Sequence, residues 1–75
     1  MDYKDRFKIE YKELKERYNK LHKIIIKYEA CTLDFTPDTP VHILEEQAKF
    51  MGNYLRILEI RAEIEKIDLE EKIGE

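Results

Sequence analysis

The sequence has a single cysteine, Cys31, so no disulfide can form within one chain. Cys31, His22 and His42 also lack the paired spacings that are typical of zinc sites. No apolar run approaches the roughly 20 residues that a membrane span requires, and the charged N-terminal residues do not resemble a signal peptide. We therefore expect a protein without metal, cofactor or membrane segment that works in a reducing cytoplasm.

Motifs for catalysis are missing as well. With only two glycines, the chain has no glycine-rich loop for phosphate groups. Neither histidine has a nucleophile and an orienting group near it in sequence, and the carboxylates fall at helical positions where they pair with lysines three or four residues away. We expect that the protein is not an enzyme, so its function must be sought on its surfaces.

What the sequence does have is typical of long helices. Its 75 residues are 43% apolar and 41% charged, which favours a helical-hairpin or coiled-coil protein over a compact mixed domain. We expect one domain over residues 1–75. A chain of this size buries little surface and often needs oligomerisation to be stable.

Two helices are predicted, joined by a turn that contains both prolines. The first covers about residues 3–29, the turn about 30–39 and the second helix about 40–70. Thr39 is expected to cap the second helix, with Pro40 in its first position. The fold class is therefore all-α, an antiparallel two-helix hairpin. The seam of the first helix has spacings of three and four and consists of Phe7, Tyr11, Leu14, Tyr18, Leu21, Ile25 and Tyr28.

The second helix carries more apolar surface than one partner helix can cover. Its main stripe consists of Val41, Leu44, Ala48, Met51, Leu55, Leu58 and Ala62. A second set lies beside it and consists of Phe50, Tyr54, Ile57, Ile60, Ile64 and Ile67. We therefore expect a homo-oligomer, a dimer or tetramer that forms an oligomeric helical bundle, with a site between subunits. Gly52 indicates either close approach of a neighbour or a tolerated surface glycine.

Charge is unevenly distributed. Residues 1–30 carry a net charge of +3 and residues 31–75 a net charge of −6, which favours docking of the two helices against each other. The bases are dispersed around the helices, so no continuous basic face exists for duplex nucleic acid.

Polar residues within the apolar surface are the candidates for a binding site. Gln47, Tyr54 and Arg61 recur every seven residues, and Arg61 requires either an internal acid such as Glu10 or a bound anion. In an antiparallel hairpin the start of the first helix faces the end of the second, so aromatic rings and guanidinium groups converge there. Rings can stack on a base and arginines can bind phosphate. Bases are expected to stack on Tyr3, Phe7 or Tyr11, and the expected phosphate ligands are Arg6, Arg56 and Arg61. Weaker candidates from a neighbouring subunit are Lys8, Lys12 and the hydroxyl of Thr36 or Thr39.

The pattern also resembles a known group of proteins. The matching residues are Tyr3, Arg6, Glu10, Leu14, Arg17 and Leu21, a proline-containing turn, and then Leu44, Gln47, Met51, Tyr54, Leu58 and Arg61. From Tyr3 to about Ile67 this resembles small bacteriophage helical-hairpin proteins of the anti-CBASS cyclic-nucleotide sponge type. The resemblance implies an oligomer in the host cytoplasm that binds a cyclic dinucleotide, such as cyclic GMP–AMP, and sequesters it without cleavage.

Two other classes of function remain open. A structural or regulatory coiled-coil protein would bind a partner protein through the spare apolar stripe. A nucleic-acid-binding regulator is opposed by the charge balance. Nucleotide binding in the absence of any host protein would separate the first class from a sponge.

Overall fold

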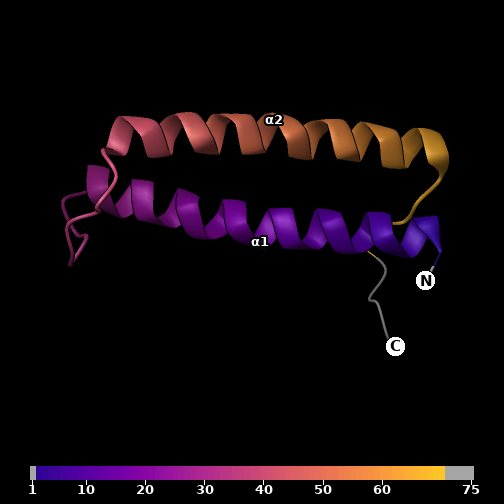
Figure 1. Cartoon of the computed structure of the whole chain (residues 1–75), viewed down its shortest axis with the longest axis horizontal. Coiled ribbons are helices and arrows are strands. Elements are labelled where there is room, and N and C mark those ends of the chain that lie inside the picture. The colour runs from indigo at the N-terminus through magenta and orange to yellow at the C-terminus, as the bar shows by residue number, and fades with distance from the viewer. Residues whose placement is uncertain (1, 71–75) are drawn as a thin grey trace.

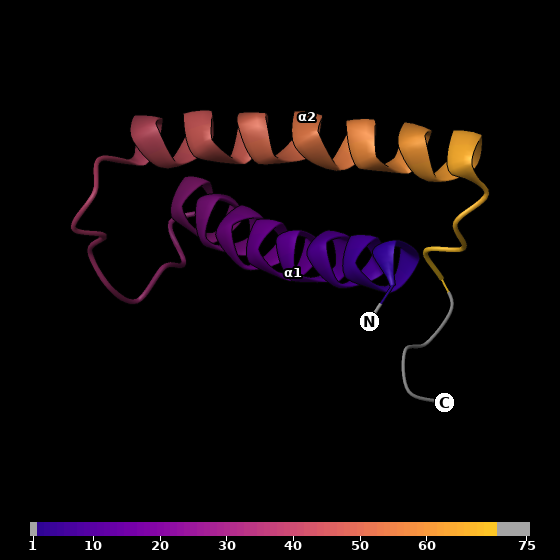
Figure 2. The ribbon, with the colours of Figure 1, turned by 45° about the vertical axis from the view of Figure 1, so that its right-hand side comes forward.

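The computed structural model describes residues 2–70 and contains two helices that pack against each other as a hairpin (Figure 1). Helix α1 is Tyr3–Glu29 and helix α2 is Val41–Glu65. The chain turns between them over residues 30–40, and the hairpin is 42 Å long. Figure 2 shows that the two helices are inclined to each other. The all-α hairpin expected from the sequence is therefore confirmed.

The helix starts differ in how they are capped. The Asp2 carboxylate accepts a hydrogen bond of 2.8 Å from the backbone N–H of Asp5, which satisfies one of the free donors at the start of α1. Before α2 the cap position is Pro40, and no side chain caps the helix. The expected capping role of Thr39 is therefore wrong, because the helix begins one residue later than that role requires.

The end of α2 departs most from expectation. The sequence predicts a helix to about residue 70, but α2 ends at Glu65 and Lys66 adopts a left-handed conformation with φ 57° and ψ 46°. The N–H of Ile67 then donates to the Ala62 carbonyl, and the chain turns back across α1 (Figure 1). This turn buries Ile67, which is 6% exposed, and packs Leu69 against the core. We call residues 66–70 the C-terminal hook.

The core lies at the end of the hairpin where α1 begins and α2 ends. Phe7, Leu58, Ala62 and Ile67 form its buried cluster, and Leu58 is fully buried. The main apolar stripe of α2 is buried or half-buried throughout, as its spacing predicts. On α1, Ile25 is also buried, and the other seam residues are half-buried except the exposed Tyr28.

A second apolar surface of α2 stays outside this core. Four of its residues follow each other at intervals of seven and are 42% to 74% exposed, namely Ile43, Phe50, Ile57 and Ile64. We call these four the apolar row. Because one turn of helix takes 3.6 residues, side chains seven apart lie nearly in line along one side of α2. The hairpin alone leaves this side without a packing partner among the described residues.

Candidate functional site

Arg61 makes three contacts on one side of the hairpin. Its Nε donates a hydrogen bond of 3.2 Å to Glu65, one turn further along α2. A terminal N–H of its guanidinium donates to the Tyr3 hydroxyl on α1. Its Cζ lies over the Phe7 ring, 5.1 Å from the centroid, within the range of a cation–π contact. The first turns of α1 and the last turns of α2 therefore position this guanidinium together.

The two aromatic rings beside Arg61 also contact each other. The centroids of Tyr3 and Phe7 are 6.2 Å apart, and the rings are tilted by 57°. Phe7 is buried, whereas Tyr3 is nearly half exposed, so only Tyr3 offers a ring surface to solvent. Interaction with the Glu65 carboxylate raises the pKa of Tyr3 and also that of Arg61, so the phenol stays neutral and the guanidinium charged.

Tyr54 lies two turns before Arg61 on the same side of the hairpin. Its hydroxyl donates to the Glu10 carboxylate on α1, and this interaction raises the pKa of Tyr54. Glu10 therefore pairs with Tyr54, and the internal acid of Arg61 is Glu65. The expectation of Glu10 as the acid that pairs with Arg61 is wrong, because Glu65 reaches it from the same helix at a spacing of four residues. We call Tyr3, Gln47, Tyr54 and Arg61 the Arg61 side.

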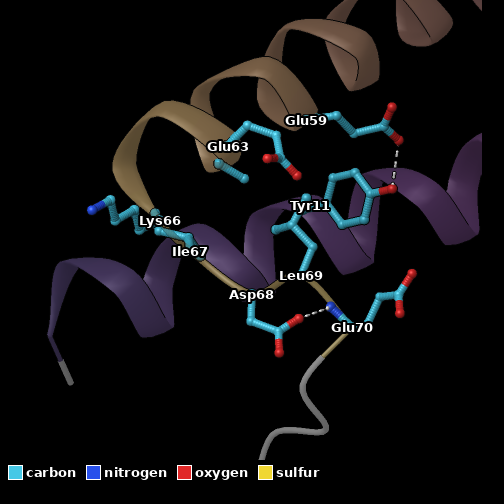
Figure 3. A pocket seen from close by; sticks show the side chains of 9 residues that line it. Tyr11, Glu59, Glu63, Lys66, Ile67, Asp68, Leu69 and Glu70 are labelled. Atoms are coloured by element: carbon cyan, nitrogen blue, oxygen red, sulfur yellow. Dashed lines mark hydrogen bonds between the residues drawn. The ribbon is translucent and has the colours of Figure 1, made fainter.

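Tyr11 lies on the opposite side of the hairpin. Its hydroxyl donates a hydrogen bond of 2.7 Å to Glu59 (Figure 3). Burial, followed by this hydrogen bond, raises the pKa of Tyr11 to about 12. Residues 59 and 61 are two positions apart, which places them about 160° apart around the helix. The structure therefore places the Tyr11 hydroxyl away from Tyr3 and Arg61, which the sequence predicted it would join, although the Tyr11 side chain packs against the core cluster that contains Phe7.

A pocket of about 580 Å³ opens beside Tyr11, between α1, the end of α2 and the C-terminal hook (Figure 3). Its lining includes four carboxylates, from Glu59, Glu63, Asp68 and Glu70, and a single base, Lys66. An Asp68 carboxylate oxygen accepts from the backbone N–H of Glu70 and holds the end of the hook. Negative charge of this density repels a phosphate group, so this pocket is unsuited to a nucleotide.

The other predicted ligand residues are spread over several faces. Arg6 is exposed one turn after Tyr3, on the same side of α1. Arg56 is exposed five residues before Arg61, about 140° away around α2, so the structure does not bring these two together. Lys8 is half-buried and Lys12 exposed; on a helix both positions fall nearer to Tyr11 than to Tyr3.

Two predicted ligand residues lie at the other end of the molecule. Thr36 and Thr39 are exposed in the turn between α1 and α2. Thr36 lines a hollow of about 490 Å³ there. Because the hairpin is 42 Å long, neither hydroxyl can reach Arg61 of the same chain. A contribution from a neighbouring subunit remains a prediction.

Gly52 marks a close approach between the helices. A Cβ built on Gly52 would lie 3.4 Å from the Tyr18 ring, so the tyrosine packs directly on the α2 backbone. Tyr18 also stacks on His22, with ring centroids 5.8 Å apart. Of the two interpretations of this glycine, the structure favours close approach of a neighbour.

Comparison with known proteins places the chain in a family. A family model described as Sequestin matches residues 1–64. The chain belongs to the Sequestin family. No curated protein and no solved structure matches it. Family membership agrees with the resemblance to phage anti-CBASS sponges and supports the coarse prediction of a sequestering protein.

The structure of this Sequestin chain also reveals contacts that the sequence analysis missed. Glu65 had a signal, because it follows Arg61 by four residues. Glu59 had no such signal, because its partner Tyr11 lies on the other helix. Within residues 2–70, neither helix has the length and apolarity that crossing a bilayer requires. No group of three or more histidines, cysteines or acids in this range is arranged to hold a metal ion.

Proposed function

We propose that this Sequestin protein binds a cyclic dinucleotide signal of bacterial CBASS defence, such as cyclic GMP–AMP, and sequesters it without cleavage. The proposed binding residues on each chain are Tyr3, Arg6 and Arg61. The Phe7 ring packs against the Arg61 guanidinium and holds it in place. Arg61 and Arg6 bind phosphate, and the exposed Tyr3 ring stacks on a base. The proposed place of action is the cytoplasm of the infected host.

The observation that carries this proposal is the environment of Arg61. Its two hydrogen bonds, to Glu65 and Tyr3, use two of the five N–H donors of the guanidinium. Its side chain is 46% exposed, so a ligand can reach the remaining donors. Contacts with Tyr3 and Phe7 fix the guanidinium before a ligand arrives, which reduces the entropy lost on binding.

Electrostatics favours this side of the hairpin over the pocket beside Tyr11. On the Arg61 side, the positive charges of Arg6 and Arg61 balance the carboxylates of Glu10 and Glu65, whereas the pocket is lined by four carboxylates and a single base. Arginine binds phosphate through paired, charge-assisted hydrogen bonds. A ligand with two phosphates therefore gains binding energy on the Arg61 side and is repelled by the pocket.

Self-association is part of the proposal. One copy exposes the apolar row, and the buried cluster of its core consists of four side chains at one end of the hairpin. We propose a homo-oligomer, a dimer or tetramer, in which a cyclic dinucleotide meets residues of more than one copy. The approximate two-fold symmetry of such a ligand suits a symmetric assembly.

Isothermal titration against a panel of cyclic di- and trinucleotides tests the ligand. We expect saturable binding of at least one cyclic dinucleotide, and weaker binding of its linear counterpart, because linearisation frees the ligand to adopt conformations that do not fit. Failure of every member of the panel to bind would reject the proposal.

The exposed apolar row also favours a second candidate, a coiled-coil protein that binds a partner protein. The two candidates differ in what purified protein does alone. A sponge binds the nucleotide with no other protein present, and Arg61→Ala weakens that binding. A partner-binding protein ignores nucleotides and loses its partner when Ile57 is replaced by glutamate.

A further inference from the structure

We infer that a second copy of the chain docks along the apolar row, with the two α2 helices antiparallel, and that each nucleotide site is shared between the copies. The interface follows from the exposed row by itself. The shared site rests in addition on the proposed function. We derive both the interface and the shared site from the residues of α2 that lie at the same height when two copies are placed side by side.

The row is complementary to itself in the antiparallel direction. Ile43 lies at the same height along the helix axis as Ile64 of the second copy, and Phe50 lies at the same height as Ile57 of the second copy. All four residues of each copy therefore meet apolar partners. The midpoint of this register falls between Asn53 and Tyr54. A two-fold axis there gives an interface in which the same surface serves both copies, as in most homodimers.

The parallel arrangement is disfavoured by charge. It would place Arg61 of each copy at the same level, where the two positive charges repel, and it would align the two helix dipoles. The antiparallel arrangement separates the two Arg61 residues by 15 positions, about 22 Å along the helix, and opposes the dipoles. Intervals of seven residues are also the repeat of packed helix pairs.

The size of the row predicts how stable the dimer is. From Ile43 to Ile64 it runs for 21 residues, about 32 Å, and a helix with its side chains is about 10–12 Å wide. The footprint on each copy is therefore about 350 Å², less than half of the roughly 800 Å² per partner in a standard stable complex. We expect a dimer that dissociates on dilution.

The register brings a new residue to the site. Gln47 and Arg61 of one copy are 14 residues apart, about 21 Å along the helix. They therefore cannot both contact the same nucleotide unit of a ligand. In the antiparallel pair, Gln47 of the second copy lies within one residue, about 1.5 Å, of the level of Arg61 of the first, on the same side of the interface. Its amide, which both donates and accepts hydrogen bonds, can then read a base edge while Arg61 binds the phosphate.

Cysteine cross-linking tests the register. In a Cys31→Ser background, Ile43→Cys and Ile64→Cys should not form disulfide-linked dimers separately, but should do so when mixed, because only the mixture brings two thiols to one level. Efficient cross-linking of Ile43→Cys with itself would show a parallel pair and overturn the inference. Absence of cross-links in the mixture would also overturn it.

A matched pair of charge substitutions tests the surface. Ile57 and Ile26 are 50% and 49% exposed, but only Ile57 belongs to the row. By sedimentation velocity over a concentration series, Ile57→Glu should be monomeric where the unmodified protein dimerises, and Ile26→Glu should behave as the unmodified protein. Equal behaviour of both variants, with helicity retained by circular dichroism, would contradict docking along the row.

Mixing two binding variants tests the shared site. Arg61→Ala and Gln47→Ala should each bind cyclic GMP–AMP at least about tenfold more weakly than the unmodified protein. In a mixture, half of the dimers are mixed and each holds one intact site, so roughly one quarter of the tight sites should return. No recovery would place Gln47 and Arg61 in separate sites and overturn sharing. If the unmodified protein binds no cyclic dinucleotide, the shared site fails with the proposed function, whereas the cross-links still decide the interface.

Discussion

At Arg61 one guanidinium connects both helices and remains accessible to a ligand. It bonds to Glu65 on its own helix and to Tyr3 on α1, and it covers the Phe7 ring. The meeting of Tyr3, Phe7 and Arg61 could be predicted from the antiparallel order of the helices. The acid that pairs with Arg61 also had a signal, because Glu65 follows Arg61 by four residues on the same helix, whereas Glu10 lies on the other helix.

Replacing this guanidinium tests its role directly. We expect Arg61→Ala to weaken cyclic GMP–AMP binding by about 1.5–3 kcal/mol, a factor of roughly 10 to 150 in the dissociation constant, because charge-assisted contacts to phosphate are lost. Calorimetry measures the change. The control is Lys49→Ala, which removes one positive charge from an exposed position on the same helix and should leave binding unchanged. Equal losses of affinity in both variants would show that Arg61 acts only through its general positive charge and not through contacts to phosphate.

Tyr11 provides a prediction about pH. Its folded-state pKa is raised to about 12 from an ordinary value of 10.0 by burial and by the bond to Glu59. The neutral phenol is favoured in the folded state, so this contribution to stability is complete below pH 10 and is lost as the pH rises towards 12. Urea unfolding at a series of pH values should show the decline in the unmodified protein and a smaller one in Tyr11→Phe. Parallel curves for the two proteins would contradict it.

Among the elements, the C-terminal hook is the one that the sequence did not reveal. Apolar residues at helical spacing continue through Ile64 and Ile67, which predicted a helix to about residue 70. In the structure Ile67 is buried by a reversal at Lys66, a residue type that rarely adopts the left-handed conformation. Without a glycine or asparagine to mark the reversal, the sequence carried no signal for it.

Truncating Ile67 measures what the hook contributes. Ile67 is 6% exposed and belongs to the main core cluster, so Ile67→Ala should lower the free energy of unfolding by about 2 kcal/mol or more through lost apolar contacts and the cavity left behind. The matched control is Ile26→Ala, at an exposed position of α1, where a change within about 0.5 kcal/mol is expected. Urea unfolding compares them. Similar small effects in both would show that the hook does not stabilise the hairpin.

At the scale of the whole molecule, the hairpin has two unlike sides. The side with Tyr3 and Arg61 carries accessible positive charge next to aromatic rings, and the side with Tyr11 carries the acidic pocket. The sequence predicted the hairpin and the excess of apolar surface, since both follow from periodic spacing. It could not separate the two sides, because the distribution of residues between them depends on how α1 and α2 are rotated against each other.

The central claim is sequestration without chemistry, and equilibrium dialysis of cyclic GMP–AMP against an excess of the protein tests it most directly. The account predicts that the ligand accumulates in the protein compartment and is recovered intact after denaturation, because binding alone removes it from solution. Equal ligand concentrations in both compartments, or recovery of a linear product, would contradict the account.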